Sequence, residues 1–228
     1  MRLDKYIANN TDFSRREVKY LLRERRIKIN GDTLKDAATK ITDTDRIELD
    51  DQPIIAIGLG YFMLNKPEGI VCANSDKDQA TVFDFIEEQH ADLHVAGRLD
   101  RDTTGLVLIT NDGQWSHRAT SPRYQCVKTY RVQTEELITA NMVAKLEKGI
   151  HLQPENIRTR PAKVDVIAED ELLLQITEGK YHQVKRMLHA VNNAVDRLHR
   201  IRIGDILLDE DLMPGEYRAL SPNEIASV

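Results

Sequence analysis

Cysteine, aromatic residues and long apolar runs are all scarce in this chain. The two cysteines, Cys72 and Cys126, do not form a CxxC pair. This count argues against a disulfide framework and a zinc site, and it favours a reducing compartment. No apolar run reaches the roughly 18 residues that a membrane span requires, and the first five residues lack the apolar core of a signal peptide. We therefore expect a soluble cytoplasmic protein with no membrane partner.

The usual sequence signatures of cofactor and metal sites are missing as well. The glycines form neither a phosphate-binding loop nor a dinucleotide-binding fingerprint, and no Ser-His-Asp set can be recognised. His90 and His94 are four residues apart, but no third metal ligand lies near them in the sequence. We therefore expect neither a cofactor nor a metal.

The charge of the chain is unevenly distributed. A net charge of −5 over 228 residues argues by itself against a nucleic-acid binder. Residues 1–28, however, carry nine Lys or Arg against four Asp or Glu, whereas residues 29–57 carry three against seven. A basic surface, if there is one, is therefore concentrated near the N-terminus.

The N-terminal segment is predicted to begin with two helices. Apolar residues at positions 3, 6 and 7 have helical spacing, and Ser14 with Glu17 forms a capping box that opens the second helix. Val18, Leu21 and Leu22 make the apolar face of that helix. Four basic residues lie in an arc beside this face: Arg15, Arg16, Lys19 and Arg23.

Short strands are predicted to follow these helices. Residues 27–29 alternate as a strand and Asn30-Gly31 makes a tight turn. Further short strands are expected at Ile41 and at residues 46–49, and residues 50–53 and 58–60 are interpreted as a linker. This pattern indicates a small autonomous α/β unit.

From Tyr61 onward, strands and helices are mixed without a regular β-α-β alternation. Strands are predicted at residues 61–66, 106–109, 129–132 and 172–176. Helices are predicted after Thr81, through Trp115 to a stop before Pro122, over residues 139–146, and around residues 184–191. This arrangement favours an α+β sheet domain over a doubly wound one.

Three separated segments carry chemically reactive side chains. Residues 97–105, GRLDRDTTG, place Asp100 and Asp102 directly before an apolar strand. Taken alone, the segment is more simply interpreted as a charged turn in which Asp100 bonds the backbone. The residues alone also do not show which of the two carboxylates would be catalytic. The second segment is Lys128-Thr129-Tyr130. The third, residues 178–187, is predicted to carry a basic helical stripe of His182, Lys185, Arg186 and His189.

These three segments resemble the signature of the pseudouridine synthases, and within them the branch typified by RsuA. The strings RLDKYI, SRREVKYLL and IKINGD near the N-terminus resemble the S4-type RNA-binding domain. The resemblance implies an α+β fold with two domains: an RNA-binding S4-like domain at residues 1–57, and a catalytic domain at 58–228 built on a mixed, mainly antiparallel sheet with flanking helices.

The resemblance also implies roles for individual residues. Asp100 would be the catalytic residue, and Tyr130 would stack on the target base and help to move a proton. Lys185 would pair with Asp100 in a desolvated pocket and keep it ionised, although many relatives carry Arg at this position. Eight residues would contact the RNA: Arg98, Arg15, Arg16, Lys19, Arg23, His182, Gln183 and Arg186.

The implied substrate is 16S ribosomal RNA, free or in a partly assembled small ribosomal subunit, and the implied target is uridine 516 in the usual rRNA numbering. The uridine would leave its stack to reach the pocket of a monomeric enzyme. Three alternatives remain open: a synthase acting on 23S rRNA, a non-catalytic rRNA-binding assembly factor, and a glycoside hydrolase using Asp100 with Asp102. The presence of Asp100, Tyr130 and Lys185 argues against the second, and the low aromatic content of 5% argues against the third.

Overall fold

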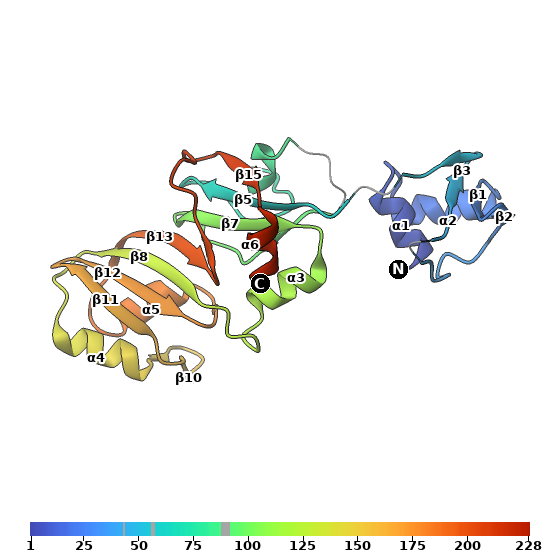
Figure 1. Ribbon diagram of the computed structural model, residues 1–228. Helices are drawn as coiled ribbons and strands as arrows, with labels where there is room; N and C mark the ends of the chain where they lie inside the picture. Colours follow the sequence, from blue (N-terminus) through green and yellow to red (C-terminus); the bar gives the residue numbers. More distant parts are fainter. Residues whose placement is uncertain (43, 56–57, 88–91) are drawn as a thin grey trace. The chain divides into compact units, whose positions relative to one another are not determined.

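The computed structural model describes residues 1–42, 44–55, 58–87 and 92–228 (Figure 1). The chain divides into a small unit, residues 1–59 with 88–93, and a large unit, residues 60–87 with 94–228. Residue 57, where the predicted domain boundary falls, and His90 lie outside the described residues. Within the described ranges, no helix is both long enough and apolar enough to cross a membrane.

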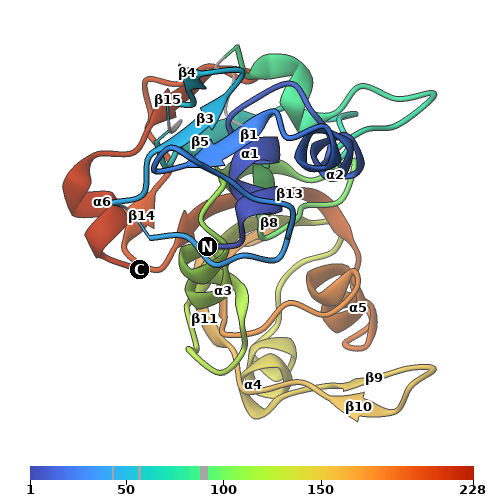
Figure 2. The ribbon, with the colours of Figure 1, turned by 90° about the vertical axis from the view of Figure 1, so that its right-hand side faces the viewer.

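The small unit packs two helices on a four-stranded sheet (Figures 1 and 2). Its elements are α1 (Leu3–Asn9), α2 (Arg15–Arg23), β1 (Ile27–Ile29), β2 (Asp32–Thr33), β3 (Ile47–Leu49) and β4 (Gln52–Pro53). The Ser14–Glu17 capping box opens α2 as predicted, and the predicted apolar face of α2 is buried. Because α1, α2, β1 and β3 all contribute fully buried aliphatic side chains, the unit has a core of its own.

Two tight turns shape the small sheet. Asn30 and Gly31 have φ of 52° and 90°, which gives the predicted hairpin turn between β1 and β2. Asp50 and Asp51 also have positive φ, 50° and 65°, and join β3 to β4. The prediction of a linker at residues 50–53 is therefore wrong, because these residues form a second hairpin. Ile41 also lies outside any strand, although its side chain is buried in the core.

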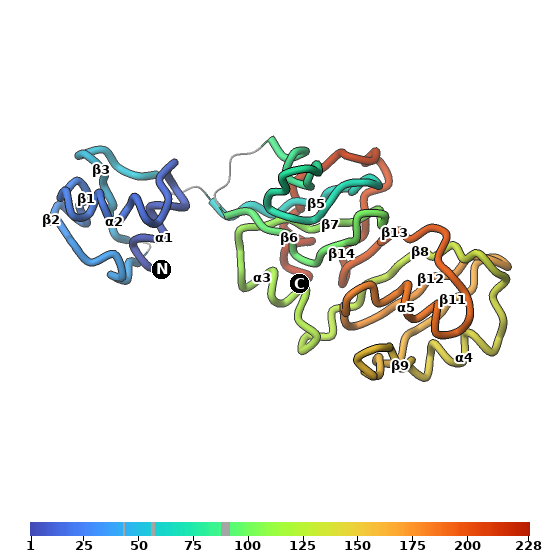
Figure 3. The backbone as a smooth tube through the Cα atoms, turned by 180° about the vertical axis from the view of Figure 1, so that it is seen from behind, coloured from blue at the N-terminus to red at the C-terminus, as the bar shows by residue number. Residues whose placement is uncertain are grey.

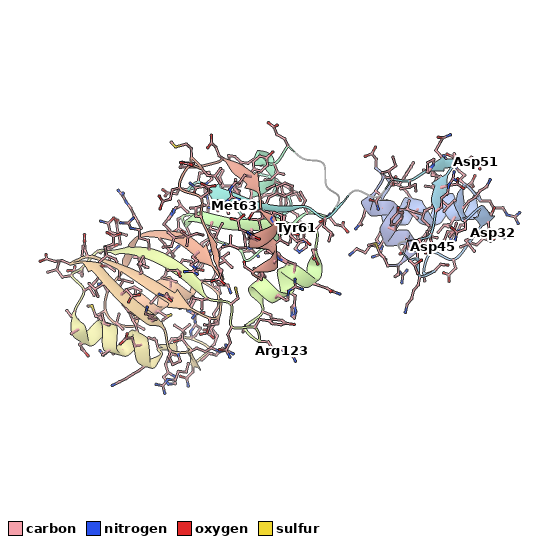
Figure 4. All side chains as sticks on the ribbon, viewed as in Figure 1. Asp32, Asp45, Asp51, Tyr61, Met63 and Arg123 are labelled. Carbon is pink, nitrogen blue, oxygen red and sulfur yellow. The ribbon has the colours of Figure 1, made fainter. Side chains whose placement is uncertain are left out.

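Several basic residues of the small unit form ion pairs with acidic residues of the same unit. Arg26 and Lys28 contact Asp50 and Asp51, each at 2.5 Å. Figure 4 labels Asp32, Asp45 and Asp51 around the hairpins of this unit. These internal pairs reduce the number of cations that are free to bind a polyanion.

Asp4 is a buried carboxylate in α1. Its side chain is 1% exposed, and it accepts hydrogen bonds from Arg2 Nη2 at 2.9 Å and Arg15 Nη2 at 2.8 Å. The hydrogen bond from Arg2 is the main cause that lowers the pKa of Asp4 from 3.8 to about 2, against the effect of burial. Arg15, predicted as an RNA contact, thus has a structural partner that holds α2 against α1.

We expect Asp4→Asn to destabilise the small unit by about 2 kcal/mol near neutral pH, because a fall of about two pKa units corresponds to that free energy. Since the pKa is lowered on folding, this stability is present above pH 3.8 and is lost as the pH falls toward 2. Amide hydrogen exchange in α1 and α2 measures it. Asp12→Asn, at an exposed carboxylate of the same unit, is the control, and equal exchange in both variants would contradict the prediction.

The large unit is built on a nine-stranded sheet. Its strands are β5 (Tyr61–Lys66), β6 (His94–Ala96), β7 (Thr104–Thr110), β8 (Lys128–Thr134), β11 (Lys163–Ala168), β12 (Glu171–Ile176), β13 (Val195–Ile203), β14 (Ile206–Leu207) and β15 (Tyr217–Ala219). The main order is β11-β12-β8-β13-β7-β5-β15, and among its described pairs the parallel one is β13 with β7. The predicted mixed, mainly antiparallel sheet is confirmed.

Short helices and a separate hairpin surround this sheet. They are the 3₁₀ helix η1 (Val82–Phe85), α3 (Gly113–Thr120), α4 (Ala140–Lys148), α5 (Gln183–His189) and α6 (Pro222–Ala226), with the hairpin β9 (His151–Leu152) and β10 (Ile157–Arg158). Helix α5 lies on one face of the sheet half formed by β8, β12 and β13 (Figures 1 and 3). Helix α3 ends before Pro122 as predicted, and Trp115 packs against Tyr61, which Figure 4 labels on β5.

Candidate active site

The large unit contains a cavity of about 630 Å³ at the point where β7 and β13 run parallel. The turn at residues 97–103 forms one wall, and residues 179–185 form another. Lys128 and Tyr130 on β8 and Arg200 on β13 also line the cavity. The three chemically reactive segments, which lie far apart in the sequence, therefore meet at one cavity.

The turn that carries Asp100 and Asp102 has a fixed backbone. Thr103 N–H donates to Asp100 O at 3.1 Å and closes the turn. Gly105, at the start of β7, has φ of 98°, and a Cβ there would stand 2.4 Å from Arg200 O. Only glycine allows this close approach of β7 to β13, which brings the turn to the cavity.

Lys66 holds one end of this turn by hydrogen bonds to main-chain oxygens. Its side chain is fully buried at the end of β5, and Nζ donates to the carbonyl oxygens of Pro67, Arg101 and Thr103 at 2.9, 3.2 and 2.7 Å. Burial lowers the pKa of Lys66. The sequence signal for this role is slight: Lys66 stands at the end of the predicted strand at residues 61–66, directly before Pro67.

Arg200 supports the other end of the turn. This buried guanidinium donates from Nη2 to Gly97 O at 2.7 Å and from Nε to Leu106 O at 2.8 Å. Its Nη1 lies 3.5 Å from Tyr130 Oη. Arg200 therefore links the backbone of the turn to the tyrosine. The alternation of Leu198 and Arg200 along β13 was the sequence signal that could have predicted an inward position for this arginine.

Tyr130 projects from the centre of the sheet into the cavity. It is paired with Leu174 of β12 on one side and with Arg200 of β13 on the other. Its ring is almost completely buried, and the guanidinium carbon of Arg200 lies 5.9 Å from the ring centroid. This position suits an aromatic face that receives a planar ligand in the cavity.

Lys185 contacts both carboxylates of the turn: Asp100, the partner that the resemblance implied, and also Asp102. Its Nζ lies 2.5 Å from Asp102 Oδ1 and 3.6 Å from Asp100 Oδ2, so Asp102 is the closer partner. The hydrogen bond from Lys185 lowers the pKa of Asp102. The side chains of Lys185, Asp100 and Asp102 are 27%, 32% and 62% exposed. The expectation of a desolvated pair is therefore wrong, because water reaches all three groups.

His182 approaches the same carboxylate from the other wall of the cavity. Its Nε2 lies 3.5 Å from Asp100 Oδ1. His182 is the cap before α5 and has left-handed φ and ψ of 47° and 36°, so it is not part of the predicted helical stripe. A non-glycine residue in this conformation is uncommon and is concentrated at functional sites.

The other residues predicted to contact RNA in the large unit differ in their environments. Gln183 is buried, donates to Glu178 Oε1 and accepts from Lys180 N, so it organises the loop. Arg186 donates to Tyr181 O and Gln153 O and pairs with Glu155. Both therefore hold the cavity rim in shape. Arg98, by contrast, is exposed beside Asp100 and lines the cavity.

The basic arc of α2 is placed in the small unit. Arg16, Lys19 and Arg23 are exposed, and Arg23 lies over the ring of Tyr20 at 5.8 Å. These three cations are available to phosphates, whereas Arg15 is held by Asp4. Among the described residues, no group of three or more His, Cys, Asp or Glu side chains could hold a metal ion.

Comparisons with known proteins agree with this division. Residues 60–190 match the family model described as RNA pseudouridylate synthase, and residues 1–47 match the S4 domain model. The chain is 50% identical over 230 residues to the ribosomal small subunit pseudouridine synthase A of Yersinia pestis, covering 100% of this chain and 98% of that protein. The corresponding protein of Escherichia coli K12 is 49% identical, with both chains covered completely.

A solved structure supports the same relationship. The crystal structure of a pseudouridylate synthase aligns with a TM-score of 0.73 and 46% sequence identity. The alignment covers 100% of this chain and 99% of that chain. The similarity therefore extends over both units.

Proposed function

Because the chain belongs to the RNA pseudouridylate synthase family, we propose that it isomerises a uridine of small-subunit ribosomal RNA to pseudouridine. In this reaction the bond from the ribose to the uracil nitrogen breaks, the uracil turns, and a bond from the ribose to a uracil carbon forms. The proton on that carbon leaves, and the nitrogen gains one. Atoms and electrons balance within the nucleotide.

The observation that carries this proposal is the convergence of Asp100, Tyr130 and Lys185 on one cavity. Asp100 would act at the ribose while the glycosidic bond is broken. Tyr130 would support the uracil ring and help to remove the proton from the ring carbon. The positive charge of Lys185 would stabilise the negative charges of Asp102 and Asp100 in the turn. Residues 58–228 would form the catalytic domain and residues 1–57 the RNA-binding domain.

The glycoside hydrolase alternative is less compatible with the charges of the site. Such an enzyme needs one carboxyl of the pair to remain protonated as a general acid, which requires a raised pKa. Lys185 lowers the pKa of Asp102, so Asp102 is not suited to that role.

The proposed target within the small-subunit 16S rRNA is uridine 516. Mapping pseudouridines in rRNA from cells that lack the protein tests it: the modification should be missing at that nucleotide and should return with the wild-type gene. A loss confined to large-subunit rRNA would contradict the proposal. Incubation of the purified protein with free 16S rRNA and with partly assembled subunits would identify the substrate form. We further propose that the protein works as a monomer in the cytoplasm.

Lys185→Met should reduce turnover by about 10- to 100-fold, because hydrogen bonds to charged groups are worth about 1.5–3 kcal/mol. The fold should lose less than about 1 kcal/mol, since the ion pairs are partly exposed. Lys185→Arg keeps the charge and should be tolerated. Single-turnover rates and urea unfolding of both variants measure these effects. Full activity in Lys185→Met would mean that this lysine is only a solvated helix position.

The basic arc of α2 should account for much of the salt dependence of RNA binding. Changing Arg16, Lys19 and Arg23 to Ala should lower the slope of log affinity against log salt by about 2–3 units, at about 0.7–0.9 per phosphate contact. Arg15 is kept, because it stabilises the unit through Asp4. The control removes two other exposed cations of the same unit, Lys35 and Lys40. An unchanged slope in the triple variant would mean that the arc does not touch RNA.

A further inference from the structure

Tyr181 is a large aromatic side chain left in solvent at the rim of the cavity. Its side chain is 74% exposed, although it lines the cavity next to the catalytic turn. A single exposed aromatic residue is common on protein surfaces and is not evidence of a site. Tyr181 differs because one of its faces is stacked on the ring of His182, with ring centroids 3.8 Å apart and planes inclined by 22°.

The stacked pair of Tyr181 and His182 extends from the solvent-exposed rim of the cavity to Asp100. His182 Nε2 lies 3.5 Å from Asp100 Oδ1, so the tyrosine ring is separated from the catalytic carboxylate by a single imidazole. A base that stacked on Tyr181 would therefore lie close to the mouth through which a uridine reaches Asp100.

The backbone that carries the pair is held firmly. Arg186 Nη1 donates to Tyr181 O at 3.0 Å, and the same guanidinium donates to Gln153 O at 2.8 Å. Gln183 Oε1 accepts from Lys180 N at 2.8 Å. His182 adopts the left-handed conformation that lets the chain turn into α5. The two rings are thus presented in a fixed place, which lowers the entropic cost of binding a planar group.

We propose that Tyr181, backed by His182, is a stacking subsite for the nucleobase next to the uridine that enters the cavity. The inference rests on the proposed function and adds a second nucleotide to its site. When the uridine leaves its stack, its neighbour loses a stacking partner, and the tyrosine ring replaces that partner. Every base has a π face, so the subsite selects an unstacked nucleotide rather than a particular sequence.

Fluorescence of 2-aminopurine placed on either side of the target uridine tests the subsite. The base should be quenched when the RNA binds the wild-type protein or Tyr181→Phe, and it should stay bright with Tyr181→Ala. RNA binding should weaken by about 5- to 150-fold in Tyr181→Ala, as expected for one lost base–aromatic stack. Tyr124→Ala is the matched control, because Tyr124 is a 51% exposed tyrosine that meets its neighbour His117 edge-on and does not line the cavity. It should behave as the wild type.

An RNA that lacks the neighbouring base separates the possible outcomes. With an abasic neighbour, Tyr181→Ala should cause no further loss of affinity, because the stack is already gone. The abasic site is placed on either side of the target uridine in turn, and an equal loss of affinity with the intact RNA and with both of these abasic RNAs would overturn the proposal. So would a fall in kcat at saturating RNA with unchanged affinity, which would assign the ring to the positioning of His182 and Asp100. Failure of the wild-type protein to form pseudouridine would refute the proposed function instead, while the quenching of bound RNA would still report on the stack.

Discussion

Replacing Asp100 by asparagine is expected to abolish uridine isomerisation while RNA affinity and the fold remain nearly unchanged. The substitution removes the charge and the reactive oxygen but keeps the shape of the side chain. The turn should keep its path, because Lys66 and Arg200 hold it through carbonyl oxygens and not through Asp100. A loss of at least about 10²–10⁴-fold in single-turnover rate is expected for a group that takes part directly in the chemistry.

Asp102→Asn is the control for this experiment, because it removes the neighbouring carboxylate from the same turn. Asp102 is 62% exposed and would influence the reaction only indirectly, through Lys185, so its loss should leave measurable turnover. Binding of a small-subunit rRNA fragment should be equal in the two variants. An inactive Asp102→Asn together with an active Asp100→Asn would show that Asp102, and not Asp100, is the catalytic carboxylate.

Tyr130→Phe should lose most of its turnover, by about 10²–10⁴-fold if the hydroxyl moves the proton, and should bind RNA almost as tightly as the wild type. The ring remains available for stacking. The fold should tolerate the change, since Arg200 loses only a 3.5 Å contact with the hydroxyl and retains its shorter bonds to Gly97 O and Leu106 O. Rates and dissociation constants on the same RNA measure the two effects. A weakening of binding as large as the loss of rate would show that the hydroxyl holds the RNA.

The parts of the fold that depend on local signals could be predicted from the sequence. The capping box of Ser14 and Glu17 and the Asn30-Gly31 turn use residues whose preferences do not depend on distant contacts. The hairpin at residues 50–53 could not be predicted in the same way. Asp50 and Asp51 are an unusual pair for two left-handed positions, and Pro53 can be a strand residue here because β4 is an edge strand.

In the site, too, the parts that depend on local sequence could be predicted and those that depend on long-range contacts could not. The three reactive segments were recognisable because each is contiguous, and the structure brings them to one cavity. The roles of Lys66 and Arg200 depend on the approach of β5, β7 and β13, and such long-range contacts leave no contiguous pattern. The preference of Lys185 for Asp102 over Asp100 is a difference between 2.5 and 3.6 Å, which depends on atomic positions beyond the reach of residue patterns.

The hydrogen bonds from Lys66 and Arg200 to the catalytic turn have a consequence for protein engineering. Lys66 and Arg200 bind main-chain oxygens, which every amino acid possesses, so this part of the turn's support stays in place when the side chains at residues 100–102 are changed. Gly97 and Gly105 are the exceptions, because their φ angles of 95° and 98° are unfavourable for other residues. A library randomised at residues 100–102 should therefore consist largely of folded proteins, and the turn could present other catalytic groups to a nucleoside.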